Sequence, residues 1–278
     1  MNSRDFSLRT RTYGKTGPGV IVLHGGPAAV GEAEPVAKGL SRNFRTFEPF
    51  QRGSGDEPLT VAVHVEDLHR LVQSINDDTR PSLVGESWGA MLALAYTSTY
   101  PDDIGALVLI GCGTFDQESR RIMNETIESR LDEPSRKKLR SLSADYADSD
   151  ERRHEQYKLT ARAYLYDPIP ADEQLELTEP FDARAHQEAW NDMLQLQEKG
   201  IYPTVFSRIK SPVLMLHGSY DPHPGKMIYA SLKAHIPHLE YHELANCGHS
   251  PWQERQARKE FFMVMINWLL THCTRPEG

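Results

Sequence analysis

The stretch Ser82-Leu83-Val84-Gly85-Glu86-Ser87-Trp88-Gly89 decides the fold of this chain of 278 residues. A short apolar run leads into Gly-x-Ser-x-Gly, and a helical segment, residues 90–96, follows at once. A serine between such a strand and helix lies in a tight, strained turn that exposes its hydroxyl. The two glycines flank it because side chains there would collide with the neighbouring strand and helix. The pattern predicts Ser87 as a nucleophile at a helix N-terminus, where negative charge on a substrate oxygen is favoured.

Short apolar runs alternate with helical stretches over much of the chain, which predicts a mainly parallel sheet covered on both faces. An edge strand or hairpin arm is expected within residues 6–13. The other expected strands are residues 20–23, 45–50, 82–84, 106–110, 213–216 and 239–244, and helices are expected at 61–75, near 226–235 and at about 254–270.

Residues 115–197 are different, because they are rich in charge and helix formers and contain no convincing strand. Prolines divide this segment into four or five expected helices. We therefore expect two parts: an α/β catalytic domain formed by residues 1–113 and 205–278, and a helical cap formed by residues 114–204.

Composition narrows the functional classes. Lys and Arg number 31 against 39 Asp and Glu, a formal charge of −8, so no general affinity for nucleic acid or an anionic membrane is expected. The N-terminus lacks the apolar core of a secretory signal, and no apolar run approaches the roughly 20 residues needed to span a bilayer. Three scattered cysteines, Cys112, Cys247 and Cys273, suit neither a disulfide framework nor a zinc site. A cytoplasmic location is predicted.

A serine nucleophile needs a base and an acid that holds the base. Asp221 follows the expected strand 213–216, and His249 follows the expected strand 239–244. Both loops leave the carboxyl edge of a parallel sheet, so Ser87, Asp221 and His249 are predicted to converge there as a catalytic triad in the order Ser, acid, His. Asp116, after the strand 106–110, is the alternative acid.

Two backbone N–H groups must stabilise the oxyanion that forms when the serine attacks. The residue after the nucleophile, Trp88, supplies one in this prediction. The second is expected from Gly26 in His24-Gly25-Gly26-Pro27, because glycines after a buried strand let the backbone approach a substrate oxygen closely.

Several polar residues have a structural interpretation. Glu86 is expected to hydrogen-bond a neighbouring loop, and Arg52 to order the loop near the oxyanion site. His217 and His223 flank Asp221, but no further spacing supports a metal site. Neither a metal nor a cofactor is predicted.

Six segments together resemble the α/β-hydrolase superfamily and, within it, its proline iminopeptidase branch. They are His-Gly-Gly-Pro-Ala (24–28), Gln-Arg-Gly-Ser-Gly (51–55), Val-Glu-Asp-Leu (65–68), Gly-Glu-Ser-Trp-Gly (85–89), Tyr-Asp (220–221) and Gly-His (248–249). The likeness covers about residues 15–113 and 205–270. It implies an eight-stranded, mostly parallel sheet flanked by helices, with a helical cap over the active site.

The chain departs from that branch at Glu86, Ala28 and Phe50, where the family usually has Gly, Gly and Asp. The resemblance implies cap carboxylates, commonly one beside a tryptophan, that bind the free α-amine of an aminopeptidase substrate. The nearest counterparts are Glu188, Trp190 and Asp192, although such carboxylates are more often a solvated helix face.

The sequence therefore predicts a serine hydrolase that cleaves an amide or ester in a small molecule or short peptide, because a cap excludes folded proteins. An aminopeptidase similar to proline iminopeptidase is the first candidate and a carboxylesterase of the same fold is the alternative. The rival from another class is a non-catalytic ligand-binding protein that keeps the fold.

Overall fold

The computed structural model describes residues 8–75, 79–145, 149–170, 173 and 180–273. This part of the chain contains a seven-stranded sheet with the order β1-β3-β2-β4-β5-β6-β7. All neighbouring strands run parallel except β1 and β3, which pair antiparallel at one edge. The strands are β1 (Thr10–Tyr13), β2 (Gly19–Leu23), β3 (Arg45–Pro49), β4 (Ser82–Glu86), β5 (Leu107–Ile110), β6 (Val213–Gly218) and β7 (Leu239–Leu244).

The described residues contain seven strands, whereas eight were expected. Of the edge strand predicted within residues 6–13, the structure describes Thr10–Tyr13, while Phe6 and Ser7 lie outside the described residues. Between β1 and β7, every apolar run predicted as a strand already has its place in the sheet. No further predicted run in that interval is left to form the eighth strand.

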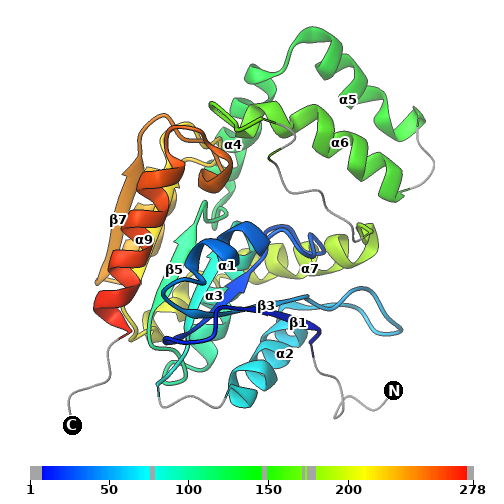
Figure 1. Ribbon diagram of the computed structural model, residues 1–278. Coiled ribbons are helices and arrows are strands. Elements are labelled where there is room, and N and C mark those ends of the chain that lie inside the picture. Colours follow the sequence, from blue (N-terminus) through cyan, green and yellow to red (C-terminus); the bar gives the residue numbers. More distant parts are fainter. Residues whose placement is uncertain (1–7, 76–78, 146–148, 171–172, 174–179, 274–278) are drawn as a thin grey trace.

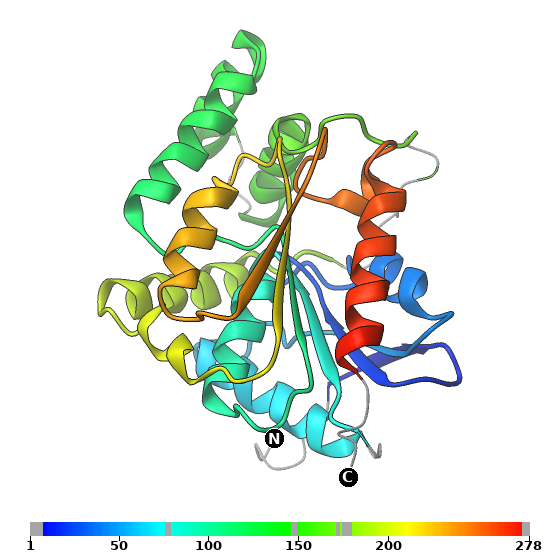
Figure 2. The same cartoon turned by 90° about the vertical axis from the view of Figure 1, so that its left-hand side faces the viewer.

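The alternation of side chains along the central strands gives the sheet two apolar faces. In β2, Ile21 and Leu23 pack on one face, whereas Val20 and Val22 pack on the other. The first face is covered by α2 (Val61–Ser74), α3 (Trp88–Thr99) and α8 (Gly225–Lys233), and the second by α1 (Glu34–Leu40) and α9 (Arg258–His272). Figure 2 shows α1 and α9 together on one side of the sheet.

Helix α3 lies at the centre of the molecule. Its residues from Trp88 to Ser98 are all buried, which explains why its sequence is apolar on every side rather than amphipathic. It packs against β4, against α2 and against the short 3₁₀ helix η3 (Thr204–Arg208). The serine before this helix is therefore anchored by the best-packed element of the fold.

Four α-helices lie between β5 and β6 in the described residues: α4 (Gln117–Arg130), α5 (Glu133–Asp145), α6 (Ser149–Tyr164) and α7 (Ala183–Glu198). This agrees with the four or five helices expected there. Helices α5 and α6 lie side by side and stand away from the sheet, whereas α7 packs against α2 (Figure 1). The division into a catalytic domain and a cap of residues 114–204 stays a prediction.

A second short 3₁₀ helix, η4 (Pro251–Gln253), precedes α9. Among the helices of the described residues, none combines the length and the apolar character that crossing a membrane requires.

Candidate active site

Ser87 connects β4 directly to α3 with a backbone conformation that few non-glycine residues adopt, φ 50° and ψ −112°. A Cβ on Gly85 would lie 2.3 Å from the carbonyl oxygen of Gly89, and a Cβ on Gly89 would lie 2.5 Å from that of Leu23. The two glycines are thus required by close backbone packing on both sides of the turn. The backbone N–H of Ser87 donates to the carbonyl of Ile110 at 2.8 Å, which joins the turn to β5.

Asp221 and His249 meet at the carboxyl ends of β6 and β7. Nδ1 of His249 donates to Oδ2 of Asp221 at 2.7 Å, and both residues are buried. The two loops are joined by backbone hydrogen bonds, since the N–H of Tyr220 donates to the carbonyl of Cys247 at 2.8 Å. The acid and the imidazole predicted from sequence therefore form a hydrogen-bonded pair.

The charges of this pair stabilise each other. Burial alone would raise the pKa of Asp221, but the imidazoles of His249, His223 and His217 hold that pKa well below its usual value. Burial alone would lower the pKa of His249, but the Asp221 carboxylate, with Glu86 and Glu32, raises it above 6.5. Asp221 is therefore ionised near neutral pH and can only accept hydrogen bonds, so the Nδ1 of His249 carries the proton.

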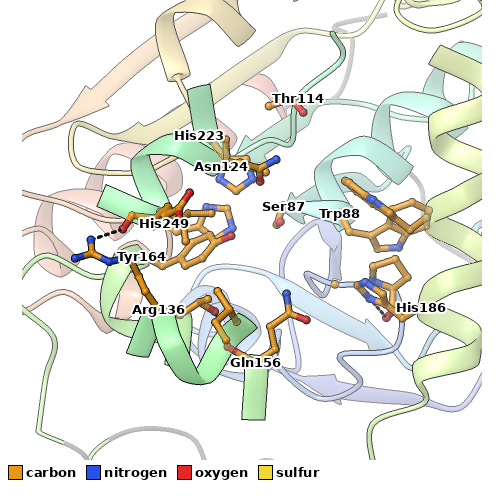
Figure 3. A pocket seen from close by; sticks show the side chains of 18 of the residues that line it. Ser87, Trp88, Thr114, Asn124, Arg136, Gln156, Tyr164, His186, His223 and His249 are labelled. Atoms are coloured by element: carbon orange, nitrogen blue, oxygen red, sulfur yellow. Dashed lines mark hydrogen bonds between the residues drawn. The ribbon is translucent and has the colours of Figure 1, made fainter. Parts of the chain in front are cut away.

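Ser87 and His249 open into one cavity of about 540 Å³. Figure 3 shows Ser87 between two groups of side chains, with His249, His223 and Tyr164 on one side and Trp88 and His186 on the other. The cavity is lined from the sheet side by Gly26, Pro27, Ser87, Trp88, Thr114, His223 and His249, and from α4 to α7 by Met123, Asn124, Ile127, Glu128, Arg136, Leu139, Arg140, Gln156, Thr160, Tyr164, His186 and Trp190.

The alternative acid, Asp116, has a structural role. It is the N-cap of α4, where its two carboxylate oxygens accept hydrogen bonds from the backbone N–H and the hydroxyl of Ser119, each at 2.7 Å. Asp221, and not Asp116, contacts the imidazole.

Gly26 and Trp88, the expected oxyanion donors, line the cavity together with Ser87. In the described part of the chain, neither backbone N–H has a hydrogen-bond acceptor. The same loop contains one residue in an unfavourable conformation. Ala28 has φ 79°, in the left-handed region where glycine is favoured, so the backbone there would suit the glycine that the resemblance implies better than it suits alanine.

An ion pair joins the loop 51–55 to the segment 65–68. Arg52 makes a bidentate ion pair with the buried carboxylate of Asp67, at 2.6 and 2.7 Å. The neighbouring Gln51 accepts a hydrogen bond from the indole N–H of Trp88 at 2.8 Å. The expectation that Arg52 orders this loop is confirmed, and the order extends to the residue after the serine.

Glu86 joins the strand-to-helix turn at Ser87 (the elbow) to the loop that carries His249 (the histidine loop). Glu86 makes the expected hydrogen bond to a neighbouring loop. Its Oε1 accepts from the hydroxyl of Ser250 at 3.2 Å, while its Oε2 is buried and has no hydrogen-bond partner among the described residues. Burial raises the pKa of Glu86 well above its ordinary value of 4.5.

The two carboxylates predicted as amine ligands lie away from the cavity. Glu188 accepts a hydrogen bond from the backbone N–H of Leu59, and Asp192 from that of Val61, both at 2.8 Å. Neither lines the cavity, whereas Trp190, between them in sequence, does. The structure therefore brings Trp190 to the site and uses the two predicted amine ligands to hold α7 against the segment that leads into α2.

Sequence reasoning missed Glu254. This fully buried carboxylate accepts from the backbone N–H groups of Tyr166, Asp167 and Gly248, at 2.7–2.8 Å. It joins the loop that carries His249 to the segment after α6. Its partners are backbone groups as many as 88 residues away, so no side-chain pattern in the sequence signals the contact.

Three polar residues of α5 and α6 that face the cavity were also missed. Arg136, Gln156 and Thr160 belong to helices rich in exposed charge, and in sequence they cannot be told from the solvated residues beside them. His223 was noted only as a neighbour of Asp221.

One group among the described residues has the composition of a metal site: Asp221, His223 and His249, whose nitrogen and oxygen atoms lie within 4.8 Å of one another. Its geometry does not fit a metal. Each carboxylate oxygen already accepts a hydrogen bond from one imidazole. The two rings are stacked within 16° of parallel, so their remaining lone pairs do not converge on one point.

Comparison with known proteins agrees with this architecture. A 2-hydroxy-6-oxononadienedioate/2-hydroxy-6-oxononatrienedioate hydrolase of Burkholderia vietnamiensis is 27% identical over 92% of this chain and 90% of its own length. A proline iminopeptidase of Heyndrickxia coagulans is 29% identical, but over 38% of this chain and 40% of its own. A solved esterase of Thermogutta terrifontis superposes with a TM-score of 0.63 at 21% identity, covering 96% of this chain and 94% of the esterase.

The family profile described as alpha/beta hydrolase fold matches residues 18–254, which include the elbow, the Asp–His pair and the glycine-rich loop. The match, the parallel sheet and the strand-to-helix turn at Ser87 agree with the fold that the sequence predicted. The chain belongs to the α/β-hydrolase fold family.

Proposed function

We propose that the protein is a serine hydrolase that attacks a substrate carbonyl with Ser87 and passes through a covalent intermediate. The observation that carries the proposal is the buried Asp221–His249 pair, which opens into the same cavity as a serine held on a strained elbow. A serine hydroxyl becomes an effective nucleophile when such an imidazole removes its proton.

The chemistry follows from the protonation states. In neutral His249, Nδ1 carries the proton donated to Asp221, so Nε2 carries a lone pair and can take the proton of Ser87 as the serine attacks. Asp221 then stabilises the imidazolium. The free N–H groups of Gly26 and Trp88 are available to the oxyanion of the tetrahedral intermediate. His249 next gives its proton to the leaving group and activates the water that releases the acyl group.

The substrate is a small molecule or a short peptide. A cavity of about 540 Å³ is within the range of small-ligand sites, roughly 300–1,000 Å³. Its outer wall comes from α4, α5 and α6, so a folded protein chain could not reach Ser87 without displacing three helices.

The bond that is cleaved has three candidates. The sequence favours an amide, as in the proline iminopeptidases, with an ester as the alternative. The positions of Glu188 and Asp192 weaken the aminopeptidase candidate, because both carboxylates accept hydrogen bonds from backbone N–H groups outside the cavity and neither lines it. An ester or a non-peptide substrate needs no ligand for an α-amine.

The third candidate is a carbonyl flanked by carbon, and a specific observation favours it. The relatives matched over about nine-tenths of both chains are named as hydrolases of hydroxy-oxo-dienedioates. A compound of that name has no ester or amide, so its hydrolysis breaks a carbon–carbon bond beside the oxo group. Arg136 and Arg140 line the cavity, and guanidinium groups bind carboxylates well.

Labelling with a fluorophosphonate probe tests the proposal. We expect Ser87 to be modified, and the variant Ser87→Ala to lose labelling and all turnover while its thermal unfolding stays that of the wild type. A folded wild-type protein that does not react with the probe would instead support the non-catalytic ligand-binding alternative.

A substrate comparison separates the candidates. Prolyl p-nitroanilide, p-nitrophenyl esters of short acids and a 2-hydroxy-6-oxo-dienoic acid represent the amide, the ester and the carbon–carbon bond. Turnover of the esters or the oxo acid without turnover of the anilide would exclude the aminopeptidase.

A further inference from the structure

Asp221 holds two imidazoles, and the proposed mechanism uses one of them. We propose that His223 is a positioning residue of the catalytic centre, which occupies the second oxygen of Asp221 and one face of the His249 ring and thereby sets the orientation and the basicity of His249. The inference deepens the proposed function and rests on its assignment of His249 as the base.

The geometry of the three residues is symmetrical. Nδ1 of His249 donates to Oδ2 of Asp221 at 2.7 Å, and Nδ1 of His223 donates to Oδ1 at 2.8 Å. The backbone N–H of His223 also donates to Oδ1, at 2.9 Å. The two imidazole rings are stacked, with centroids 4.5 Å apart and planes 16° from parallel, and both line the cavity (Figure 3).

The hydrogen bonds determine where the protons lie. Ionised Asp221 can only accept, so both imidazoles must carry a proton at Nδ1. Burial lowers the pKa of His223, and although Asp221 opposes this effect, the neighbouring His249 adds to it. His223 is therefore neutral when His249 takes up the proton of the serine, and a second positive charge stacked on the first is avoided.

A donor on Oδ1 withdraws charge from the carboxylate that His249 faces. An ionised carboxylate accepting several hydrogen bonds is a weaker base, and it stabilises a nearby imidazolium less. The stacked ring also excludes water from one face of His249. Both effects of His223 oppose protonation of His249, so its removal should make His249 more basic.

Other charged and titratable groups also face the pair, and none of them is substituted in the His223 variants. Nε2 of His217 lies 3.3 Å from Oδ2 of Asp221, at the end of β6. The others are Glu86 from β4, Glu32 from the loop before α1, Arg130 from α4, Tyr164 from α6, Cys112 from the loop after β5, Tyr241 from β7 and Cys247 from the loop after β7.

Two substitutions of His223 separate the effect of its Nδ1–H donor from the effect of its aromatic ring. His223→Leu removes the side-chain donor and keeps an apolar side chain, whereas His223→Asn keeps an N–H at about the position of Nδ1 and removes the aromatic face. In both variants the backbone donor to Oδ1 remains. His242→Leu, a change at a partly exposed histidine on β7 that pairs with Glu260, is the matched control.

The first measurement is the rate of fluorophosphonate labelling of Ser87 as a function of pH, whose acid limb reports the pKa of His249 in the free enzyme. We expect His223→Leu to shift the acid limb upward by about half a unit to one unit and to lower the plateau rate. His223→Asn should shift the limb by less than half of that amount, and His242→Leu should leave it in place.

An acid limb that is the same in His223→Leu and the wild type would overturn the inference, as would equal shifts in the two His223 variants. The second measurement needs neither labelling nor the Leu variant to fold. Proton NMR of the Ser87→Ala protein should show two downfield Nδ1–H resonances, one of which disappears in His223→Asn; a single resonance would also overturn the inference. Failure of the wild type to react with the probe would contradict the proposed function, while the NMR experiment would still decide the role of His223.

Discussion

At the scale of single residues, the strained backbone conformation of Ser87 persists because the surrounding backbone is packed too closely for another one. A residue at positive φ costs on the order of 1–3 kcal/mol, and such strain persists only where the surroundings enforce it. Here they do so through α3 and β2, whose backbones approach so closely that a Cβ on Gly89 would lie 2.5 Å from the carbonyl oxygen of Leu23, at the end of β2, and 2.6 Å from that of His24.

We therefore expect Gly89→Ala to lower the free energy of unfolding by about 1–3 kcal/mol or more, because the new methyl group must push the elbow and β2 apart. Activity should fall as well, since Ser87 moves with the elbow. Gly55→Ala is the control, because a Cβ there meets nothing within 4 Å and should change stability little. Urea unfolding measures both, and equal stabilities for the two variants would contradict the steric argument.

Glu86 makes stability depend on pH in a direction opposite to that of most carboxylates. Burial raises the pKa of Glu86 in the fold above the ordinary 4.5, and the repulsion between the Glu32 and Glu86 carboxylates adds to burial in raising that of Glu32. The native state thus binds a proton that the unfolded chain has released. This contribution to stability is complete below pH 4.5 and is lost as pH rises through the native pKa.

The quantity to follow is the free energy of unfolding of the wild type minus that of Glu86→Gln. We expect it to fall as pH rises above 4.5, by at most about 1.4 kcal/mol per pH unit. Subtracting the variant removes the contributions of the other titrating groups. Glu57→Gln, at an exposed position, should give a curve parallel to that of the wild type. Urea titrations from pH 4.5 to 8 test this, and a difference that grows with pH would refute it.

At the scale of elements, α7 is held to the sheet domain by a row of carboxylates. Asp182, Glu188 and Asp192 accept hydrogen bonds from the backbone N–H groups of Ser54, Leu59 and Val61. Val61 is the first residue of α2, so Asp192 satisfies one of the free N–H groups at that helix end from a different element.

Asp192→Ala should lower the free energy of unfolding by about 1–2 kcal/mol, because the N–H of Val61 loses its charged acceptor. KM should stay unchanged for any substrate that is hydrolysed, since the carboxylate does not line the cavity. Glu198→Ala changes an exposed carboxylate of the same helix and serves as control. A variant with wild-type stability and a raised KM for an amine substrate would restore Asp192 as an amine ligand.

The elements that sequence could predict are those whose signal is local. The strand predicted at 20–23 matches β2 within one residue, because a run of apolar residues reflects burial in the sheet. The strand predicted at 239–244 matches the edge strand β7, although only its two terminal leucines are buried. The last helix was expected from residue 254, yet α9 begins at Arg258. The difference has a physical cause, since Glu254 points its carboxylate at three backbone N–H groups instead of entering the helix.

In the candidate site, too, sequence could predict the residues with a local signal but not those whose role depends on tertiary contacts. Asp221 and His249 could be predicted because each follows a strand that ends at one edge of the sheet, and the structure pairs them. The roles of Glu188 and Asp192 could not be predicted, because a carboxylate on an amphipathic helix has the same sequence pattern whether it binds a ligand, a distant backbone or water. Their contacts depend on how α7 packs against α2, which only the tertiary structure shows.

At the scale of the whole molecule, the helices between β5 and β6 are joined at two points to the loops that carry Asp221 and His249. Arg130 at the end of α4 donates to the carbonyl oxygens of Ala163 and Tyr220, each at 2.7 Å, and stacks on the Tyr220 ring. His249 donates its backbone N–H to the carbonyl of Tyr164. The end of α6 thus contacts the loop of His249 directly, and Arg130 bridges it to the loop of Asp221, so its position affects the placement of the His249 imidazole.

Glu254 is the second of these points, and its replacement tests whether the helices between β5 and β6 position the imidazole of His249. In Glu254→Gln one carboxylate oxygen becomes an amide NH₂, which opposes a backbone N–H instead of accepting from it. We expect a loss of about 2–4 kcal/mol in the free energy of unfolding, because hydrogen bonds to a buried charge are lost and a donor is left unpaired. The turnover number should fall tenfold or more, since Gly248 precedes His249 and a small displacement of the imidazole slows proton transfer.

Glu260→Gln, at a half-exposed carboxylate on α9 that pairs with His242, should change stability by less than about 0.5 kcal/mol. Urea unfolding and steady-state kinetics on the same preparations measure both effects. A destabilised Glu254→Gln variant with an unchanged turnover number would show that the histidine loop keeps its geometry without the hydrogen bonds of Glu254.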